Sequence, residues 1–207
     1  MVQATSSAAG RSKWPRMSYE EYLCDSTIPP HTEWVDGEVV EMMSVSKAHA
    51  QTVRYLLQLL EAYLVARPLG DLYFEPFNMK TAVDLPGRSP DIMFVSAERA
   101  DAVGDLSLQG PADVVIEVIS PGTEGTDRGD KFLEYEQGGV AEYWVVDPLR
   151  EIADFYVRGE DGLFRSGSVD AEGSFASTVL PGLRIHPDWL WARRPVRQVM
   201  RELGLDD

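Results

Sequence analysis

The sequence predicts an α/β (α+β) protein in which strands and helices alternate, with an antiparallel extension of strands toward the C-terminus. The run Val114-Val-Ile-Glu-Val-Ile119 is almost purely apolar and β-branched, which is typical of a strand buried on both faces. Residues 47–67 repeat apolar side chains at helical spacing. Residues 151–180 carry three short strand patterns, separated by glycine-containing turns at 159–162 and 170–173.

Length and composition indicate one domain of ordinary size. The chain has 207 residues, of which 44% are hydrophobic, enough for a substantial core. We interpret residues 1–16 as a flexible N-terminal tail, 17–190 as a single domain and 191–207 as an Arg-rich C-terminal segment. The single cysteine, Cys24, excludes an intrachain disulfide and suits a reducing, cytoplasmic location. No apolar run is long enough to span a membrane, so we expect no membrane partner.

The charge of the chain is strongly acidic. A net charge of −15 argues against a wide nucleic-acid-binding surface, which is normally basic. Five arginines nonetheless gather near the C-terminus, namely Arg184, Arg193, Arg194, Arg197 and Arg201. We favour a solvated helix face or an interface for this cluster over a phosphate-contacting patch.

The N-terminal part of the domain predicts a short helix and a hairpin. Ser18-Tyr-Glu-Glu21 has the form of a capping box and should begin a helix that runs to about Leu23. Asp36-Gly37 supplies the positive φ angles of a tight turn between strands at 33–35 and 38–41. In this hairpin Val35 and Glu38 flank the turn, and Glu33 lies near Val40 across the ladder.

The longest predicted helix covers residues 47–67 and ends before Pro68 and Gly70. Its apolar stripe consists of His49, Val53, Leu56, Leu60 and Leu64, broadened by Leu57 and Tyr63. His49 stands at the start of this stripe. It is therefore either a boundary histidine packed against the core or part of a site.

The middle of the chain alternates between strand and helix patterns. Further strands are expected at residues 71–74, 77–83, 91–95 and 142–146, with a loop and a weak helical turn over 98–110. Asp127 is a candidate N-cap, with Asp130 as the acid of a capping box, for a helix that ends at Gly138-Gly139. Asp127, Lys131 and Tyr135 recur every four residues and therefore share one face of that helix.

Glu117 is the residue that most clearly indicates a functional site in this sequence. The two-residue period of a strand places Val115, Glu117 and Ile119 on one face, so a single charge lies among hydrocarbon side chains. A buried, unpaired carboxylate is costly, and Glu117 therefore needs a nearby cation, either a basic side chain or a metal ion. We expect burial and neighbouring like charges to raise its pKa, and Lys131 to oppose them.

Asp91, Glu117 and Lys131 lie on neighbouring predicted elements and together can form a hydrolytic site for phosphodiesters. Two carboxylates can hold a hard divalent cation such as Mg²⁺ or Mn²⁺ through oxygen, with water completing its octahedron. The cation would activate a water for attack, and the lysine would position that water or stabilise the developing negative charge. The alternative is structural, with Lys131 neutralising Glu117 and no metal present.

Five segments form a joint pattern along the chain. They are Trp34-Val-Asp-Gly-Glu38, Ser89-Pro-Asp-Ile92, Val115-Ile-Glu-Val-Ile-Ser-Pro121, Asp127-Arg-Gly-Asp-Lys131 and Gly139-Val-Ala-Glu-Tyr-Trp-Val-Val-Asp-Pro148. The pattern covers roughly residues 17–187 and resembles the Uma2 family, restriction-endonuclease-like proteins common in bacteria. The resemblance implies a PD-(D/E)xK nuclease fold, in which a restriction-endonuclease-like mixed sheet is flanked by helices.

The resemblance also implies an Mg²⁺- or Mn²⁺-dependent endonuclease that acts on DNA, with Asp91 and Glu117 as the metal ligands. The lysine that usually follows the second acid would fall at Ile119 and is absent here. The Uma2 pattern resembles one in which Lys131, on the next helix, takes that role.

The same resemblance suggests further site residues and an oligomeric state. Glu33, Glu38 and His49 match family-like positions, while Asp127 and Tyr135 share the helix face of Lys131. A homodimer is expected, because a double-strand cut needs two sites. The rival interpretation is a non-catalytic protein that retains the nuclease fold for binding or assembly.

Overall fold

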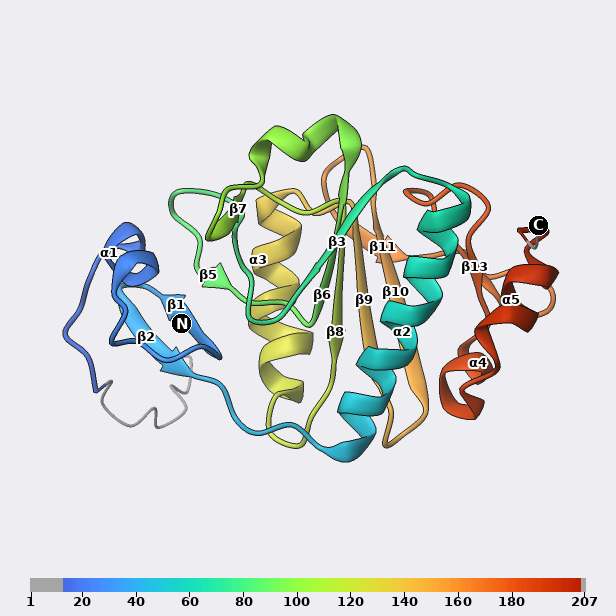
Figure 1. The fold of residues 1–207 in the computed structure, drawn as a ribbon, viewed down its shortest axis with the longest axis horizontal. Coiled ribbons are helices and arrows are strands. Elements are labelled where there is room, and N and C mark those ends of the chain that lie inside the picture. The colour runs from blue at the N-terminus through green and yellow to red at the C-terminus, as the bar shows by residue number, and fades with distance from the viewer. Residues whose placement is uncertain (1–12, 206–207) are drawn as a thin grey trace.

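A six-stranded mixed β-sheet forms the centre of the computed structural model, which describes residues 13–205 (Figure 1). Its strand order is β11-β10-β9-β8-β6-β3. These strands are β3 (Gly70–Phe74), β6 (Ile92–Ser96), β8 (Val114–Val118), β9 (Glu142–Asp147), β10 (Ile152–Arg158) and β11 (Phe164–Ser166). β8 and β9 pair in parallel, and the other neighbouring strands of this sheet pair antiparallel.

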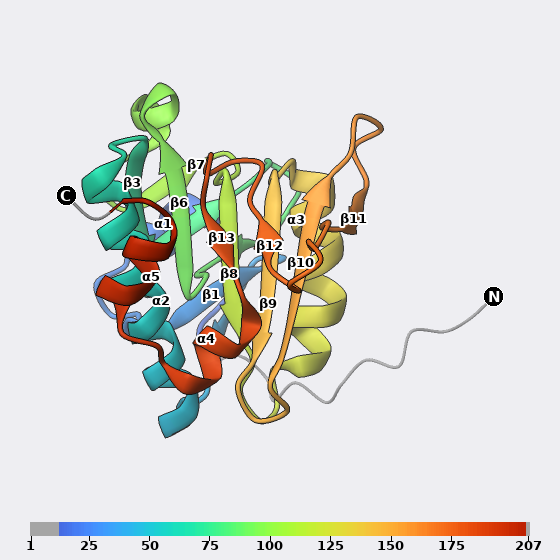
Figure 2. The same ribbon diagram turned by 90° about the vertical axis from the view of Figure 1, so that its right-hand side faces the viewer.

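Helices cover both faces of this sheet, which confirms the predicted fold class. α2 (Lys47–Ala66), α4 (Pro187–Ala192) and α5 (Val196–Glu202) lie on one side, and α3 (Lys131–Gly138) lies on the other (Figures 1 and 2). The larger hydrophobic core lies beneath α2 and receives Val114, Ile116 and Val118 from β8. Val199 and Met200 of α5 belong to the same core, so the C-terminal segment packs with the rest of the fold.

The buried face of α2 is rotated slightly from the predicted stripe. Val53 and Leu64 are only partly buried, whereas Thr52, Tyr55 and Leu59 are fully buried. The helix packs against α4 and α5 as well as against the sheet, so its buried face is wider than a one-sided stripe.

A smaller sheet, ordered β2-β1-β5-β4-β7, lies beside α3. Its strands are β1 (Thr32–Val35), β2 (Glu38–Glu41), β4 (Asn78–Lys80), β5 (Gly87–Arg88) and β7 (Ser107–Gln109). Met79 of β4 and Leu108 of β7 share a second core with Val115 of β8 and Tyr135 of α3. The side of β8 that carries Glu117 therefore faces α3 and this second core.

The N-terminal predictions hold closely. Ser18 caps α1 (Tyr19–Cys24) with a reciprocal capping box to Glu21, as the sequence predicts. The hairpin β1–β2 pairs Val35 with Glu38, and Gly37 in its turn has a φ of 86°. Residues 1–12 of the predicted tail lie outside the described residues; Trp14 packs against the cluster that contains Tyr19 and Tyr22.

Several boundaries differ from the prediction. The strand expected at 77–83 is reduced to β4, and the loop expected at 98–110 contains a 3₁₀ helix, Ala97–Ala102, and the strand β7. β7 pairs in parallel with β4, so its partner is distant in sequence. The C-terminal extension is antiparallel as predicted, but its last strands, β12 (Phe175–Ala176) and β13 (Arg184–Ile185), form a separate pair. Among residues 13–205, no helix is long and apolar enough to cross a membrane.

Candidate active site

Glu117 lies near the C-terminal end of β8, in which all five residues are buried. Two donors end on the same carboxylate oxygen, because Lys131 Nζ and Tyr135 Oη each lie 2.9 Å from Glu117 Oε1. Burial raises the pKa of Glu117 well above its usual range, and the neighbouring carboxylates raise it further, while Lys131 opposes them. This is the direction expected from the sequence.

Lys131 lies among three carboxylates at the first turn of α3. Its Nζ is 2.9 Å from Glu117, 3.4 Å from Glu33 and 3.4 Å from Asp127. Burial alone would lower the pKa of this ammonium, but the carboxylates, led by Glu117 and Glu33, raise it well above its usual range. The side chain is therefore a permanently charged donor and does not serve as a proton acceptor.

Asp127 faces Lys131 from within the helix, and its predicted role as N-cap is wrong. Its N–H donates to Thr123 O at 2.9 Å, so the chain is already helical before this residue. A π-helical turn, Thr126–Asp130, leads directly into α3. Burial raises the pKa of Asp127, and Lys131 partly offsets that rise.

Asp91 reaches the site because β6 pairs with β8. Ile92 lies opposite Ile116, which places Asp91 beside the C-terminal end of β8. Asp91 Oδ2 accepts the N–H of Val118 at 2.6 Å, and His49 Nε2 lies 3.0 Å from Asp91 Oδ1. His49 is therefore buried in direct contact with Asp91.

Glu33 and Arg88 form the side of the site that the small sheet contributes. Arg88 donates to Glu33 Oε2 at 2.8 Å and makes two bonds of 2.7 Å to Glu134 of α3. Burial alone would raise the pKa of Glu33, but Lys131 and Arg88 outweigh it and the pKa is lowered. Sequence reasoning missed Arg88, because both of its partners are more than forty residues away along the chain.

The predicted residue Glu38 is not part of this cluster. It lies at the turn end of β2, exposed, and pairs with Arg16 at 3.3 Å. A pair this exposed contributes little to stability. Glu38→Gln should therefore leave any nuclease activity unchanged and alter the free energy of unfolding by less than about 0.5 kcal/mol. Thermal melting and a cleavage assay beside wild type check this, and a tenfold loss of activity would contradict it.

A cavity of about 350 Å³ opens onto these side chains. Seven carboxylate residues line it, namely Glu33, Glu41, Glu75, Asp91, Glu117, Asp127 and Asp130. The cations among its lining residues are Arg88 and Lys131, with His49 as a third basic group. Two buried polar atoms beside it, His49 Nδ1 and Ser120 Oγ, have no hydrogen-bond partner within the described residues. The cavity is thus acidic and still has hydrogen-bonding capacity to offer.

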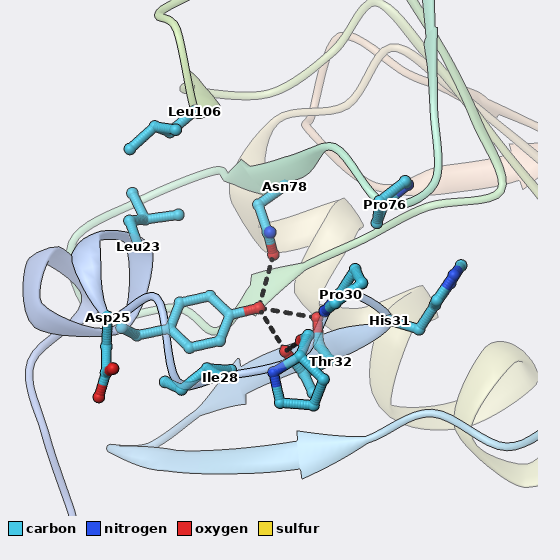
Figure 3. A pocket seen from close by; sticks show the side chains of 11 residues that line it. Leu23, Asp25, Ile28, Pro30, His31, Thr32, Pro76, Asn78 and Leu106 are labelled. Atoms are coloured by element: carbon cyan, nitrogen blue, oxygen red, sulfur yellow. Dashed lines mark hydrogen bonds between the residues drawn. The ribbon is translucent and has the colours of Figure 1, made fainter.

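A second cavity, of about 290 Å³, lies between α1 and the small sheet (Figure 3). Tyr22 lines it, and its hydroxyl lies 2.8 Å from Thr32 O and 3.3 Å from Asn78 Oδ1, two acceptors for its single hydrogen. Thr32 and Glu33 are successive residues of β1, so their side chains point to opposite faces and toward different cavities. Three of the polar residues that line this second cavity, Tyr22, Thr32 and Asn78, are thus hydrogen-bonded to one another.

The acidic cavity fits a divalent cation chemically. Within residues 13–205, no three His, Cys, Asp or Glu side chains are arranged to ligate a metal by themselves. Mg²⁺ does not need three, because it is commonly held by one or two carboxylates together with water and substrate phosphate oxygens. Asp91 and Glu117 both line the cavity at the C-terminal end of β8, where their carboxylates are available to such a cation.

The fold, a mixed sheet flanked by helices, is of the restriction-endonuclease-like type. The chain belongs to the Uma2 family, described as "Putative restriction endonuclease", whose match covers residues 19–188.

Two other proteins are similar to this chain. A solved structure described as a "putative nuclease belonging to DUF820" from Anabaena variabilis has the same fold, with a TM-score of 0.68 and 14% identity; the match covers 85% of this chain and 98% of that one. The "Uncharacterized protein slr1290" of Synechocystis is 28% identical over 153 residues, which are 72% of this chain and 78% of that protein.

Proposed function

We propose that this protein is a divalent-cation-dependent nuclease that hydrolyses phosphodiester bonds of DNA. Asp91 and Glu117 hold the cation, Mg²⁺ or Mn²⁺, and Lys131 acts beside it. The family and the nuclease-like fold support the general activity. One observation of this chain carries the specific proposal, namely a buried excess of negative charge around a single fixed lysine.

The charges of the cluster do not balance. Its carboxylates are Glu33, Asp91, Glu117, Asp127 and Glu134, and its permanent cations are Arg88 and Lys131. Uncompensated buried charge is strongly unfavourable. A buried ion pair that serves only packing can often be replaced by apolar residues without loss of stability, so packing alone does not explain the charges of this cluster. A divalent cation at Asp91 and Glu117 removes most of this excess and accounts for the cluster.

Each side chain has a role that its contacts support. Lys131 is held as an ammonium by its three carboxylates, so it donates hydrogen bonds to the attacking water or to the phosphoryl oxygens. His49 and the Val118 N–H fix the orientation of Asp91. Tyr135 does the same for Glu117. When bound, the cation would supply Lewis-acid activation of the scissile phosphate and of the attacking water.

The test is cleavage of labelled DNA in Mg²⁺, in Mn²⁺ and in a chelator. Wild type should cleave only with the cation, and Asp91→Asn should be at least about a hundredfold slower while still folded. Glu38→Gln is the matched control, since it removes an acid from the neighbouring strand without touching the cavity. Activity that persists in chelator, or in Asp91→Asn, would contradict the assignment.

A further inference from the structure

One wall of the acidic cavity is apolar. Val35 and Val40 of the hairpin and Met42, Met43 and Val45 of the connection to α2 all line it. Val40 faces the site because it pairs with Glu33 across the hairpin, and paired residues share a face. Val40, Met43 and Val45 are 42%, 63% and 47% exposed, so large apolar surface remains uncovered beside the candidate catalytic groups. We call these five residues the apolar wall.

Another part of the cavity lining is polar. It is built by Ser120, Thr123 and Thr126 together with Asp127 and Asp130, all from the segment between β8 and α3. A ligand that fills this cavity therefore meets both hydrocarbon and hydrogen-bonding groups, the latter next to the candidate metal site. A nucleotide has this asymmetry, since its base offers an apolar face and its phosphate is charged.

The size of the cavity restricts how a nucleic acid can enter. The side chains of Asp91, Glu117 and Lys131 lie below the surface, with residue exposures of 7%, 3% and 4%. A phosphodiester must therefore move into a space of about 350 Å³ to reach them. Double-helical DNA is stiff over many base pairs, so one paired nucleotide cannot bend into such a space while its neighbours stay stacked.

The charge of the cavity also disfavours duplex DNA as the substrate. A protein that binds duplex DNA gains most of its affinity by neutralising many phosphates with Lys and Arg. Here the two permanent cations of the cavity, Arg88 and Lys131, are buried and already paired with carboxylates. The seven carboxylates of the cavity instead repel each additional phosphate. Affinity must therefore come from contacts to the base, which do not depend on charge.

We propose that the cavity accepts a DNA strand that is unpaired at the cleavage site, with one nucleobase placed against the apolar wall and its phosphodiester directed toward Asp91 and Glu117. Enzymes that act on an extruded base hold it between aromatic or apolar side chains in the same manner. The inference rests on the proposed nuclease function and specifies its substrate. One site suffices to cut an unpaired strand, so activity does not require the homodimer that a double-strand cut would need.

The first experiment compares three labelled DNAs of one sequence, namely a single strand, a full duplex and a duplex with a short unpaired bubble. In Mg²⁺ or Mn²⁺, wild type should cut the single strand and the bubble at least about tenfold faster than the duplex. A duplex cut as fast as the single strand would overturn the inference and leave the nuclease function standing. If none of the three is cut, the nuclease function fails, and fluorescence anisotropy with the same DNAs decides whether unpaired DNA is still bound in preference.

The second experiment tests the apolar wall itself. Met43→Ser combined with Val45→Ser should raise KM for the single strand on the order of tenfold and leave kcat nearly unchanged, because contact with the base is lost. Leu106→Ser is the matched control, since Leu106 is a similarly exposed apolar residue, at 53%, that lines the second cavity. An unchanged KM in the double variant, or an equal rise in the control, would overturn the role of the wall.

Discussion

Lys131→Met should abolish nuclease activity and lower the free energy of unfolding by about 3–5 kcal/mol near pH 7 in metal-free buffer. Lys131 is buried and lies within 3.4 Å of Glu117, Glu33 and Asp127. Without it, three buried carboxylates lose a shared counter-charge. Protonation of Glu117, whose pKa is already raised, limits the cost, so the destabilisation should shrink as the pH falls.

Chemical denaturation with and without Mn²⁺ measures this effect. Mn²⁺ should stabilise the variant, because Asp91 and Glu117 remain to bind it, and activity should stay absent. Lys47→Met, on the exposed first turn of α2, removes the same charge without a buried partner and is the control. A Lys131→Met protein as stable as wild type in chelator would show that the cluster is not held together by this lysine.

Glu117→Gln should be inactive and yet more stable than wild type in chelator. Burial and the neighbouring acids raise the pKa of Glu117 above its ordinary 4.5 in the folded state. A carboxyl group whose pKa is raised by folding stabilises the folded state fully at a pH below its pKa in the unfolded chain. That stabilisation is lost as the pH rises through its pKa in the folded protein. Gln does not titrate. The difference in unfolding free energy between Glu117→Gln and wild type should therefore grow as the pH rises above about 4.5, by about 1.4 kcal/mol for each unit by which folding raises the pKa of Glu117.

Glu142 provides a matched comparison for this second prediction. It is also a fully buried glutamate, but its carboxylate accepts hydrogen bonds from Trp144, Ser177, Thr178 and Val179. Glu142→Gln would point an amide donor at these donors and should destabilise the fold. Denaturation of both variants from pH 4 to pH 9 tests the contrast. Equal losses of stability in the two would remove the argument that Glu117 is a functional charge.

The parts of this structure that the sequence predicted are those that depend on local pattern. The alternation of β8 placed Glu117 and Val115 on the face opposite Val114 and Ile116, and the structure shows this arrangement. The four-residue spacing of Lys131 and Tyr135 likewise brings both to Glu117. Hairpin and capping-box signals are local for the same reason.

The parts that the sequence did not predict depend on partners that are distant along the chain. Arg88 is a site residue only because Glu33 and Glu134 meet it from two other elements. Asp127 has the residue type of an N-cap, but a π-helical turn extends the helix past it. Glu33 and Glu38 both match the family pattern. Only Glu33 of these two lines the cavity, because Glu38 lies at the turn end of the hairpin.

Calorimetric titration of Mn²⁺ into the protein tests the central claim most directly, because it asks whether Asp91 and Glu117 hold one cation together. Wild type should bind a single Mn²⁺, Lys131→Met and Glu38→Gln should keep that binding, and Asp91→Asn and Glu117→Gln should each weaken it at least about tenfold. A wild type that binds no divalent cation, or binding that survives in both Asp91→Asn and Glu117→Gln, would contradict the account.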